Sequence, residues 1–203
     1  MVLKVYHAPP SRSVRVVWAL EELGLPYEVE RMKFDRAYFK SPEWRAVSPA
    51  GKIPVVHDDG KALIESVAII HYIAETYGEG KLARRPADPD YGEFLQWLHY
   101  GEAGIGPYGS MLIGQTRVLP KEQRVEAMKE WAIGECKNSC GLVESTLDGR
   151  DFILGEFSLA DISLGYMLFL IKLSGESEAI FGPRTKLYLE RLTGREAWKT
   201  ATG

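Results

Sequence analysis

The sequence is poor in cysteine, in histidine and in net charge, and it has no long hydrophobic run. Its 203 residues include two cysteines and four histidines, and the formal net charge is −3. This small acidic balance argues against a nucleic-acid surface, because such surfaces gather lysine and arginine in a patch or stripe. The longest apolar stretch, Ile162 to Ile171, is too short to cross a bilayer. We therefore expect no nucleic-acid partner and no membrane partner.

The few cysteines and histidines also show no pattern of a metal or redox site. Cys136 and Cys140 form a CxxxC spacing in a segment that is expected to be helical, whereas redox motifs use CxxC and zinc sites need further ligands. The histidines show no H-E-x-x-H spacing. A phosphate loop and a G-x-G-x-x-G motif after a strand are missing as well. We expect two ordinary thiols and neither a metal nor a nucleotide.

The first residues, M-V-L-K-V-Y, lack a basic segment that leads into a long apolar run. Such a segment is the mark of a secretory signal. The expected location is therefore the cytoplasm.

The most informative stretch runs from Ser48 to Ser66 and reads S-P-A-G-K-I-P-V-V-H-D-D-G-K-A-L-I-E-S. Pro54 lacks a backbone N–H, and a proline at such a bend is a candidate for a cis peptide bond. If the bond is cis, the backbone groups of Ile53 would point outward, where an extended peptide could pair with them. Asp59-Gly60 is typical of a two-residue hairpin turn. The stretch therefore predicts a site for a peptide-like ligand.

The residues after this hairpin predict an amphipathic helix over 67–77, because apolar residues recur there at three- and four-residue spacing. Ser66 is expected to be the N-cap of this helix. Unpaired amides and the positive end of the helix dipole favour a carboxylate there, while Glu65 could hold an ammonium group. The pair predicts a pocket for the end of an α-amino acid.

The remaining patterns predict two domains, an α+β domain at 1–80 and an all-helical domain at 90–203, joined by a linker rich in glycine, proline and charge at 81–89. The expected elements of the first domain are a strand at 2–6, a helix ending at Gly24, a strand at 27–32, a helical piece from Arg36 to Trp44, the hairpin at 55–64 and the helix at 67–77. The expected helices of the second domain lie at 91–100 and onward, 121–146, 158–173 and 185–192.

A second motif, Ser158-Leu159-Ala160-Asp161-Ile162, precedes a segment that is apolar nearly all round. Ser158 can cap the helix and Asp161 at its third position can bond back, which is a capping box. A helix that is apolar on every side lies in the centre of a bundle. Asp161 is therefore expected to be structural.

The runs S-P-A-G-K-I-P-V-V and I-E-S-V-A-I-I-H-Y-I resemble the glutathione site of the cytosolic glutathione transferases, and S-L-A-D-I is typical of the helical domain of that family. The resemblance covers essentially the whole chain and implies a thioredoxin-like domain followed by a helical one. It also implies glutathione as co-substrate. Ile53 and Pro54 would pair with its cysteinyl backbone, Glu65 and Ser66 would hold its γ-glutamyl end, and Lys52 would lie near its glycyl carboxylate.

The resemblance further implies a group that stabilises the glutathione thiolate. In the serine-type classes the activating serine lies four or five residues before the arginine that precedes valine, and Ser11 lies four residues before Arg15. Ser11 is therefore the expected donor to the sulfur. Tyr6, Arg12 and Ser13 remain alternatives, although Ser13 is close enough to the helix to be expected as a cap or as a solvated side chain. The loop has no cysteine, which disfavours chemistry through mixed disulfides.

The function that the resemblance implies is detoxification by conjugation of the glutathione thiolate to a small hydrophobic electrophile. The electrophile is expected between the domains, with Pro9 and Tyr108 as binding residues and Tyr100, Ile105 and Met111 as further candidates for an apolar wall. Family members are usually dimers, so a homodimer is expected. Two alternatives stay open: a non-catalytic module for protein association, and a glutathione-dependent isomerase, peroxidase or dehalogenase.

Overall fold

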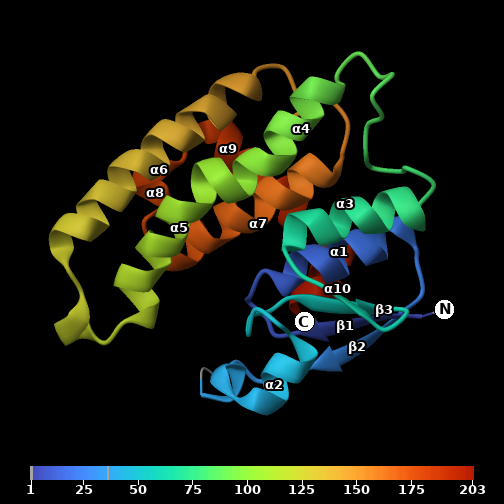
Figure 1. Ribbon diagram of the computed structural model, residues 1–203. Helices are drawn as coiled ribbons and strands as arrows, with labels where there is room; N and C mark the ends of the chain where they lie inside the picture. Colours follow the sequence, from blue (N-terminus) through green and yellow to red (C-terminus); the bar gives the residue numbers. More distant parts are fainter. Residues whose placement is uncertain (1, 36) are drawn as a thin grey trace. The chain divides into compact units, whose positions relative to one another are not determined.

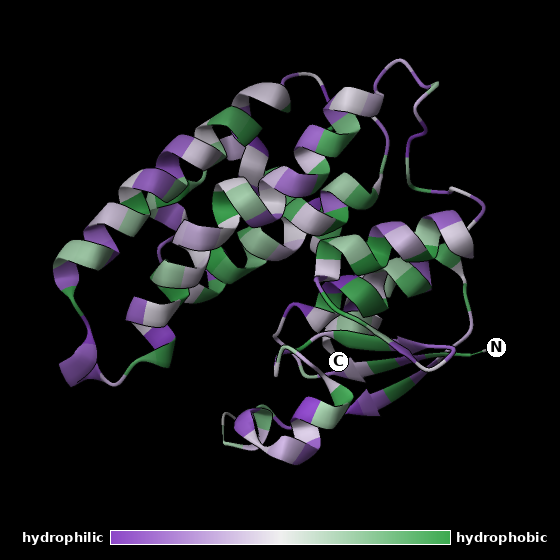
Figure 2. Cartoon of the chain, in the orientation of Figure 1, coloured by the Kyte–Doolittle hydropathy of each residue, from purple (hydrophilic) through white to green (hydrophobic). Residues whose placement is uncertain are grey.

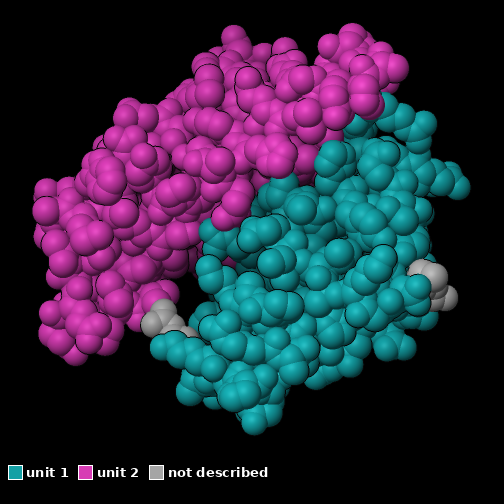
Figure 3. Space-filling model, viewed as in Figure 1, with its two compact units in different colours: residues 1–85, 195–203 teal, residues 86–194 magenta. Residues whose placement is uncertain are grey.

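The computed structural model describes residues 2–35 and 37–203, which form two compact units (Figures 1 and 3). Unit 1 comprises residues 1–85 together with 195–203, and unit 2 comprises residues 86–194. Arg36, where the second predicted helical piece begins, lies outside the described residues.

Unit 1 has the predicted order of strands and helices, with a short 3-10 turn before α2 and one further helix at its end. Its elements are β1 (Leu3–His7), α1 (Ser13–Leu23), β2 (Tyr27–Arg31), η1 (Tyr38–Lys40), α2 (Pro42–Val47), β3 (Val55–Asp58), β4 (Lys61–Leu63), α3 (Ser66–Thr76) and α10 (Glu196–Thr202). Helix α1 ends at Gly24 with φ +64°, as the sequence predicts for a C-terminal glycine.

The sheet of unit 1 has the strand order β2-β1-β3-β4. Strand β2 runs parallel to β1, whereas β3 runs antiparallel to both β1 and β4. Tyr6 of β1 lies opposite Val55 of β3, so the end of β1 and the start of β3 share one edge of the sheet. The turn between β3 and β4 has positive φ at Asp59 (47°) and Gly60 (79°), which confirms the predicted hairpin turn.

The two faces of this sheet carry different helices, because successive residues of a strand point to opposite sides. Helices α1 and α3 cover one face, and α2 lies on the other (Figure 1). On the α2 face, Tyr6 packs in a buried cluster with Phe39, Trp44 and Val55. His7, the next residue of β1, is fully buried and points to the α1 side.

The last helix, α10, belongs to unit 1, whereas the sequence predicts that residues 90–203 form the helical domain. Trp198 stacks edge-on against Trp18 of α1, with 4.9 Å between ring centroids. Nη2 of Arg195 lies 2.7 Å from Oε2 of Glu22. These contacts bury the apolar side of α10 against α1, and they explain why the observed boundary differs from the predicted one.

Unit 2 contains no strand among its described residues, in agreement with an all-helical domain. Its elements are α4 (Tyr91–Tyr100), a π-helical segment (Gly101–Ile105), α5 (Gly106–Ile113), a second π-helical segment (Gly114–Val118), a 3-10 turn (Lys121–Gln123), α6 (Glu126–Thr146), α7 (Leu159–Ser174), α8 (Ser177–Ile180) and α9 (Pro183–Thr193). Only the short α8 lacks a counterpart among the helices predicted for this part of the chain.

Helix α7 is the buried centre of unit 2, and it is mostly green and white where α6 carries purple bands (Figure 2). The predicted capping box is present at its start. Asp161 accepts from the Ser158 amide (2.8 Å), the Ile153 amide (3.0 Å) and the Tyr188 hydroxyl (2.7 Å). Burial raises the pKa of Asp161, while these hydrogen bonds act in the opposite direction. The Asp161 carboxyl group therefore has a structural role, because these hydrogen bonds join it to Ser158, Ile153 and Tyr188.

Gly101 allows the segment after α4 to approach α7 closely. A Cβ at this position would lie 2.7 Å from the backbone carbonyl of Ser163, which is closer than atoms can pack.

No helix formed by the described residues is long and apolar enough to span a membrane.

Candidate functional site

Ser11 lies in the loop between β1 and α1, at the amino end of that helix. Its amide donates to the Ala8 carbonyl (2.8 Å), and its carbonyl accepts from the Val14 amide (3.1 Å) as the helix begins. The side chain of Ser11 is partly exposed. A helix amino end stabilises a nearby anion, because its dipole is positive there and its first amides have no partner within the helix. Ser11 is therefore a hydroxyl at a position suited to an anionic ligand atom.

Ser13 is neither a cap nor solvated, which corrects the expectation from the sequence. It is the first residue of α1, after the N-cap Arg12, and it is fully buried. Its Oγ lies 2.7 Å from Nδ1 of His7 and 2.9 Å from Oγ of Ser11, and it accepts from the Ala8 amide at 3.1 Å. The hydroxyl of Ser13 is turned inward because these three groups surround it.

Tyr6, the alternative donor, lies in the core on the α2 side of the sheet. Its ring packs edge-on against Trp44 (5.6 Å between centroids) and against His57 (5.3 Å). It is 7% exposed. This packing supports Ser11 over Tyr6 as the hydroxyl that a ligand can reach.

The loop before β3 is held in shape by a buried serine, Ser48. Its Oγ donates to the Lys52 carbonyl (2.8 Å) and accepts from the Lys52 amide (3.3 Å). Gly51 has φ +64°, and a Cβ there would lie 2.9 Å from the Phe39 carbonyl. Glycine is therefore required at this turn, for its backbone conformation and for the space it leaves.

The Ile53-Pro54 peptide bond at the end of this loop is cis, as the sequence suggested. The backbone hydrogen bonds between described residues include none from the Ile53 amide or to its carbonyl. Lys52 beside it is exposed. The loop thus presents an unpaired backbone edge next to a lysine side chain.

Helix α3 begins at Ser66, so Glu65 occupies the N-cap position that the sequence assigned to Ser66. Glu65 is exposed and has φ +67°, a conformation that residues with a side chain rarely adopt. Ser66 is almost fully buried, and its Oγ accepts from Nη1 of Arg15 at 3.1 Å. Ser66 does not cap because the arginine of α1 holds its hydroxyl.

These contacts bring together three segments that are far apart in the sequence. Arg15 of α1 joins the amino end of α1 to the amino end of α3 through Ser66. The pairing of Tyr6 with Val55 places the loop after β1 beside the loop before β3. Ser11, the Ile53-Pro54 loop and the Glu65-Ser66 pair therefore converge at one edge of unit 1.

The residues predicted to bind the electrophile fall in different units. Pro9 belongs to the loop after β1 in unit 1, and it is partly buried. In unit 2, Tyr108 of α5 stacks edge-on against Trp131 of α6, with 5.6 Å between centroids. Tyr100 donates to the Ser139 carbonyl at 3.3 Å, and Ile105 is fully buried. Ile105 is a core residue, since no part of it is accessible.

Met111, the last of the expected wall residues, is partly buried in α5. The assignment of Pro9 and Tyr108 to the electrophile remains a proposal.

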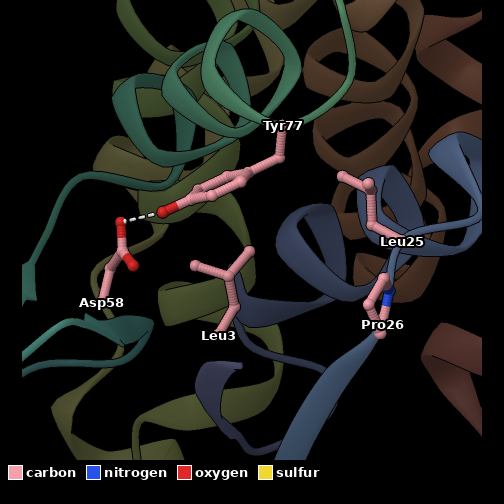
Figure 4. A pocket seen from close by; sticks show the side chains of 5 residues that line it. All are labelled: Leu3, Leu25, Pro26, Asp58 and Tyr77. Atoms are coloured by element: carbon pink, nitrogen blue, oxygen red, sulfur yellow. Dashed lines mark hydrogen bonds between the residues drawn. The ribbon is translucent and has the colours of Figure 1, made fainter. Parts of the chain in front are cut away.

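A separate cavity of about 50 Å³ lies at the opposite edge of the unit 1 sheet. It is lined by Leu3, Leu25, Pro26, Asp58 and Tyr77, and the hydroxyl of Tyr77 points at the Asp58 carboxylate (Figure 4). The hydrogen bond between them is 2.7 Å long. Asp58 ends β3, whereas the Pro54 loop precedes β3, so this cavity is not part of the candidate site.

The described residues contain no group of histidine, cysteine and acidic side chains that could hold a metal ion. Cys136 and Cys140 are buried and free. Burial raises the pKa of Cys136 to about 12, so it is protonated at neutral pH and unsuited to attack.

The first 75 residues match the family described as "Glutathione S-transferase, N-terminal domain". Glutathione S-transferase 1 of Schizosaccharomyces pombe is 32% identical over 162 residues, which cover 77% of this chain and 70% of that protein. The chain belongs to the glutathione S-transferase family.

Two further comparisons agree with membership of the glutathione S-transferase family. Glutathione S-transferase 3 of Schizosaccharomyces pombe is 37% identical over 111 residues, although that match covers 53% of this chain and only 44% of that protein. A crystal structure of a glutathione transferase from Burkholderia graminis is 31% identical, with a TM-score of 0.87, and covers 99% of this chain and 87% of that chain. That structure holds two glutathione molecules per subunit.

Three residues of the candidate site had no assigned role in the sequence interpretation: His7, Arg15 and Ser48. All three are fully buried polar residues. A weak signal existed for His7 and Arg15, because each lies where the flanking pattern is apolar and predicts burial, and a buried polar side chain needs a partner. The partners themselves come from distant segments or from the turn geometry.

Proposed function

We propose that this protein is a glutathione transferase that adds the glutathione thiolate to small hydrophobic electrophiles. The observation that carries the proposal is the convergence of three features at one edge of unit 1. These are a partly exposed hydroxyl at the amino end of α1, an unpaired backbone edge at Ile53, and a second helix amino end at Ser66. They would serve, in that order, the sulfur, the peptide backbone and the γ-glutamyl end of the tripeptide.

The thiolate is the reactive form of glutathione, but a free thiol of this kind has a pKa of about 8.5. Lowering it by about two units requires roughly 2.7 kcal/mol of preferential stabilisation of the anion. The Ser11 hydroxyl would donate to the sulfur, and the amino end of α1 would add the favourable dipole. Ser11 acts as a hydrogen-bond donor to an anion and forms no covalent bond with the substrate.

The remaining groups would bind the peptide. The Ile53 amide and carbonyl would pair with the cysteinyl backbone as a neighbouring strand would. The α-carboxylate of the γ-glutamyl group would lie at the amino end of α3, where Ser66 and the first helical amides lie, and Glu65 would bind its ammonium group. The exposed Lys52 would attract the glycyl carboxylate.

We further propose that the protein is cytoplasmic, forms a homodimer and acts in detoxification. Pro9 and Tyr108 are the residues proposed to bind the electrophile. Sedimentation of the purified chain measures the oligomeric state directly. Replacing Tyr108 by Ala should change KM for the electrophile more than KM for glutathione. The reverse result would place Tyr108 outside the electrophile site.

The central experiment compares Ser11→Ala with Ser41→Ala. Ser41 is a matched control because it also lies at a helix amino end, where its Oγ accepts from the Trp44 amide at 3.2 Å. Ser11→Ala should lower kcat/KM for a model aryl halide about 10- to 100-fold at neutral pH, while the affinity for S-methylglutathione stays close to wild type. Ser41→Ala should leave both unchanged.

Each contrary outcome has a defined meaning. A Ser11→Ala variant as fast as wild type would remove Ser11 from its role and leave Tyr6 and Arg12 as candidates. Glutathione binding without conjugation of any aryl halide would favour isomerase, peroxidase or dehalogenase chemistry. Absence of glutathione binding at millimolar concentration would favour a non-catalytic module.

A further inference from the structure

A continuous chain of hydrogen bonds runs from a buried histidine to the hydroxyl that is proposed to meet the sulfur. Nδ1 of His7 lies 2.7 Å from Oγ of Ser13, and Oγ of Ser13 lies 2.9 Å from Oγ of Ser11. His7 and Ser13 are fully buried, and Ser11 is partly exposed. This chain of hydrogen bonds therefore leads from the interior of unit 1 to the edge where Ser11, the Ile53-Pro54 loop and the Glu65-Ser66 pair converge.

The Ser13 hydroxyl cannot donate to both His7 and Ser11, nor accept from both. A hydroxyl has one proton and two lone pairs, and one lone pair already accepts the Ala8 amide at 3.1 Å. One lone pair and one proton remain for His7 and Ser11. If Nδ1 of His7 carries hydrogen, Ser13 accepts from His7 and donates to Ser11. If Nδ1 is bare, the direction of both hydrogen bonds reverses.

The direction matters because it decides where the proton of Ser11 points. When Ser13 donates, Ser11 Oγ accepts from the Ser13 hydroxyl and also from the Ser13 amide at 3.3 Å. Both lone pairs of Ser11 are then engaged, and its own proton is left to donate outward. When the chain runs the other way, the Ser11 proton is directed inward to Ser13, and the Ser11 hydroxyl cannot donate to a sulfur anion.

The surroundings of His7 favour the outward direction. Burial, together with the positive charge of Arg31, lowers the pKa of His7 to about 4, and the Ala201 backbone opposes this more weakly. The ring is therefore neutral at pH 7 and carries one N–H. The Ala201 carbonyl is the acceptor that a proton on Nε2 would meet, but no hydrogen bond of acceptable geometry forms at Nε2 with a described residue, so a buried proton there would be held poorly. A proton on Nδ1 meets the Ser13 oxygen directly.

We propose that His7 is a positioning residue, whose Nδ1–H acts through Ser13 to hold the Ser11 hydroxyl with its proton directed at the glutathione sulfur. This inference rests on the proposed function, because it assigns His7 a role only if Ser11 donates to a thiolate. No covalent bond forms and no net proton transfer to His7 is involved.

The test measures the pKa of the thiol of bound glutathione by titrating the ultraviolet absorbance of the thiolate. His7→Leu removes the donor to Ser13 and should raise that pKa by about one unit, with a fall of about tenfold in kcat/KM at neutral pH. His7→Asn, whose side-chain amide can still donate to Ser13, should restore most of the shift. The affinity for S-methylglutathione, which has no thiol, should stay within about twofold of wild type for both.

Ser13→Ala supplies an independent route to the same result, in case His7→Leu folds poorly. It should raise the thiol pKa as much as His7→Leu does, and the double variant should add nothing further, because both changes break one chain. His57→Leu is the matched control. His57 is another histidine of this sheet, and its Nε2 contacts the Val47 carbonyl at 2.8 Å, so its loss should leave the thiol pKa unchanged.

The outcomes separate this inference from the function on which it rests. If Ser11→Ala leaves the thiol pKa unchanged, the role of Ser11 fails, and the inference fails with it. If Ser11→Ala raises the pKa but His7→Leu and Ser13→Ala do not, only the inference is overturned. Loss of S-methylglutathione affinity without a change in thiol pKa would show that His7 merely braces the loop.

Discussion

The amino ends of α3 and α7 have similar sequences, but their serines are used in opposite ways. Ser158 precedes α7, where its Oγ accepts from the Ala160 amide at 3.2 Å and Asp161 bonds back to the Ser158 amide at 2.8 Å. Ser66 is the first residue of α3, and the cap position belongs to Glu65, which makes no side-chain cap hydrogen bond with the described residues. One helix end is closed by its own residues, and the other is open.

The difference lies in the third helical position. In α7 this position holds Asp161, whose carboxylate can reach back to the cap. In α3 it holds Ala68, which has no such group. An open helix end keeps its first amides available for a ligand carboxylate, so the comparison separates an end that stabilises the fold from an end that is suited to binding.

The largest expected effect comes from removing the carboxylate that closes α7. Asp161→Ala should lower the free energy of unfolding by about 3–5 kcal/mol, because it leaves buried donors from Ser158, Ile153 and Tyr188 without an acceptor. Urea denaturation measures the loss. Asp148→Ala is the control, since Asp148 is 74% exposed and pairs with Arg184 at the surface, and it should cost less than about 1 kcal/mol. Equal losses would contradict the role of Asp161.

Lowering the pH tests a third helix amino end, that of α1, whose N-cap residue makes no side-chain cap hydrogen bond with the described residues. His7 contacts Ser13, the first residue of this helix. The pKa of His7 is about 4 in the folded protein, against about 6.5 when unfolded. The unfolded chain therefore binds more protons below pH 6.5, and stability should fall between about pH 6.5 and pH 4, by up to roughly 3 kcal/mol. The free energy of unfolding as a function of pH gives this slope. His7→Asn should flatten it, and an unchanged slope would show that His7 is not its source.

Exchanging the two serines for alanine tests the comparison itself. Ser66→Ala should weaken S-methylglutathione binding about 5- to 30-fold, which is 1–2 kcal/mol, with a smaller loss of stability. Ser158→Ala should reduce stability by about 1–2 kcal/mol through the lost cap and leave the affinity unchanged. Calorimetry measures the S-methylglutathione affinity of each variant, and urea denaturation measures its free energy of unfolding. Equal effects on binding would remove the distinction between the two ends.

The smallest expected effect concerns the strained backbone at Glu65, whose φ is +67°. Glu65→Gly should raise the free energy of unfolding by about 0.5–1 kcal/mol, because glycine adopts positive φ without steric cost. Glutathione binding should weaken at the same time, since the carboxylate is lost. Glu65→Gln keeps the strain and serves as the control, with stability close to wild type. If Glu65→Gly is less stable than wild type, the strain is not released by glycine.

Most of the fold could be predicted from local patterns in the sequence. The Asp59-Gly60 turn, the helix end at Gly24 and the capping box at Ser158 each depend on neighbours within a few residues, and all three are present. The family was predicted from the resemblance of the Ser48–Ser66 stretch to the glutathione site of glutathione transferases, and the comparisons confirm it. These features are local because turn and cap chemistry is set within one turn of the chain.

The parts that differ depend on contacts between distant residues. Ser66 was expected to cap α3, but Arg15, fifty-one positions away, holds its hydroxyl. Ser13 was expected to face solvent or cap α1, but the end of β1 places His7 against it. Trp198 packs on Trp18, although periodicity shows only that a face is apolar and not which element covers it. The ligand-facing residues of the candidate site therefore stay a prediction from the sequence, whereas the residues that support them, His7, Arg15 and Ser48, were missed.

The return of α10 to unit 1 has a consequence for how the chain is made. The ribosome delivers residues 1–85 first, then the whole of unit 2, and only then the helix whose Trp198 and Ala201 complete the buried surface on the α1 side. The sheet unit can hence gain its last layer only after every residue of the helical unit has been synthesised. We expect nascent chains stalled before residue 195 to bind glutathione weakly, even though every residue proposed to contact the tripeptide has already emerged.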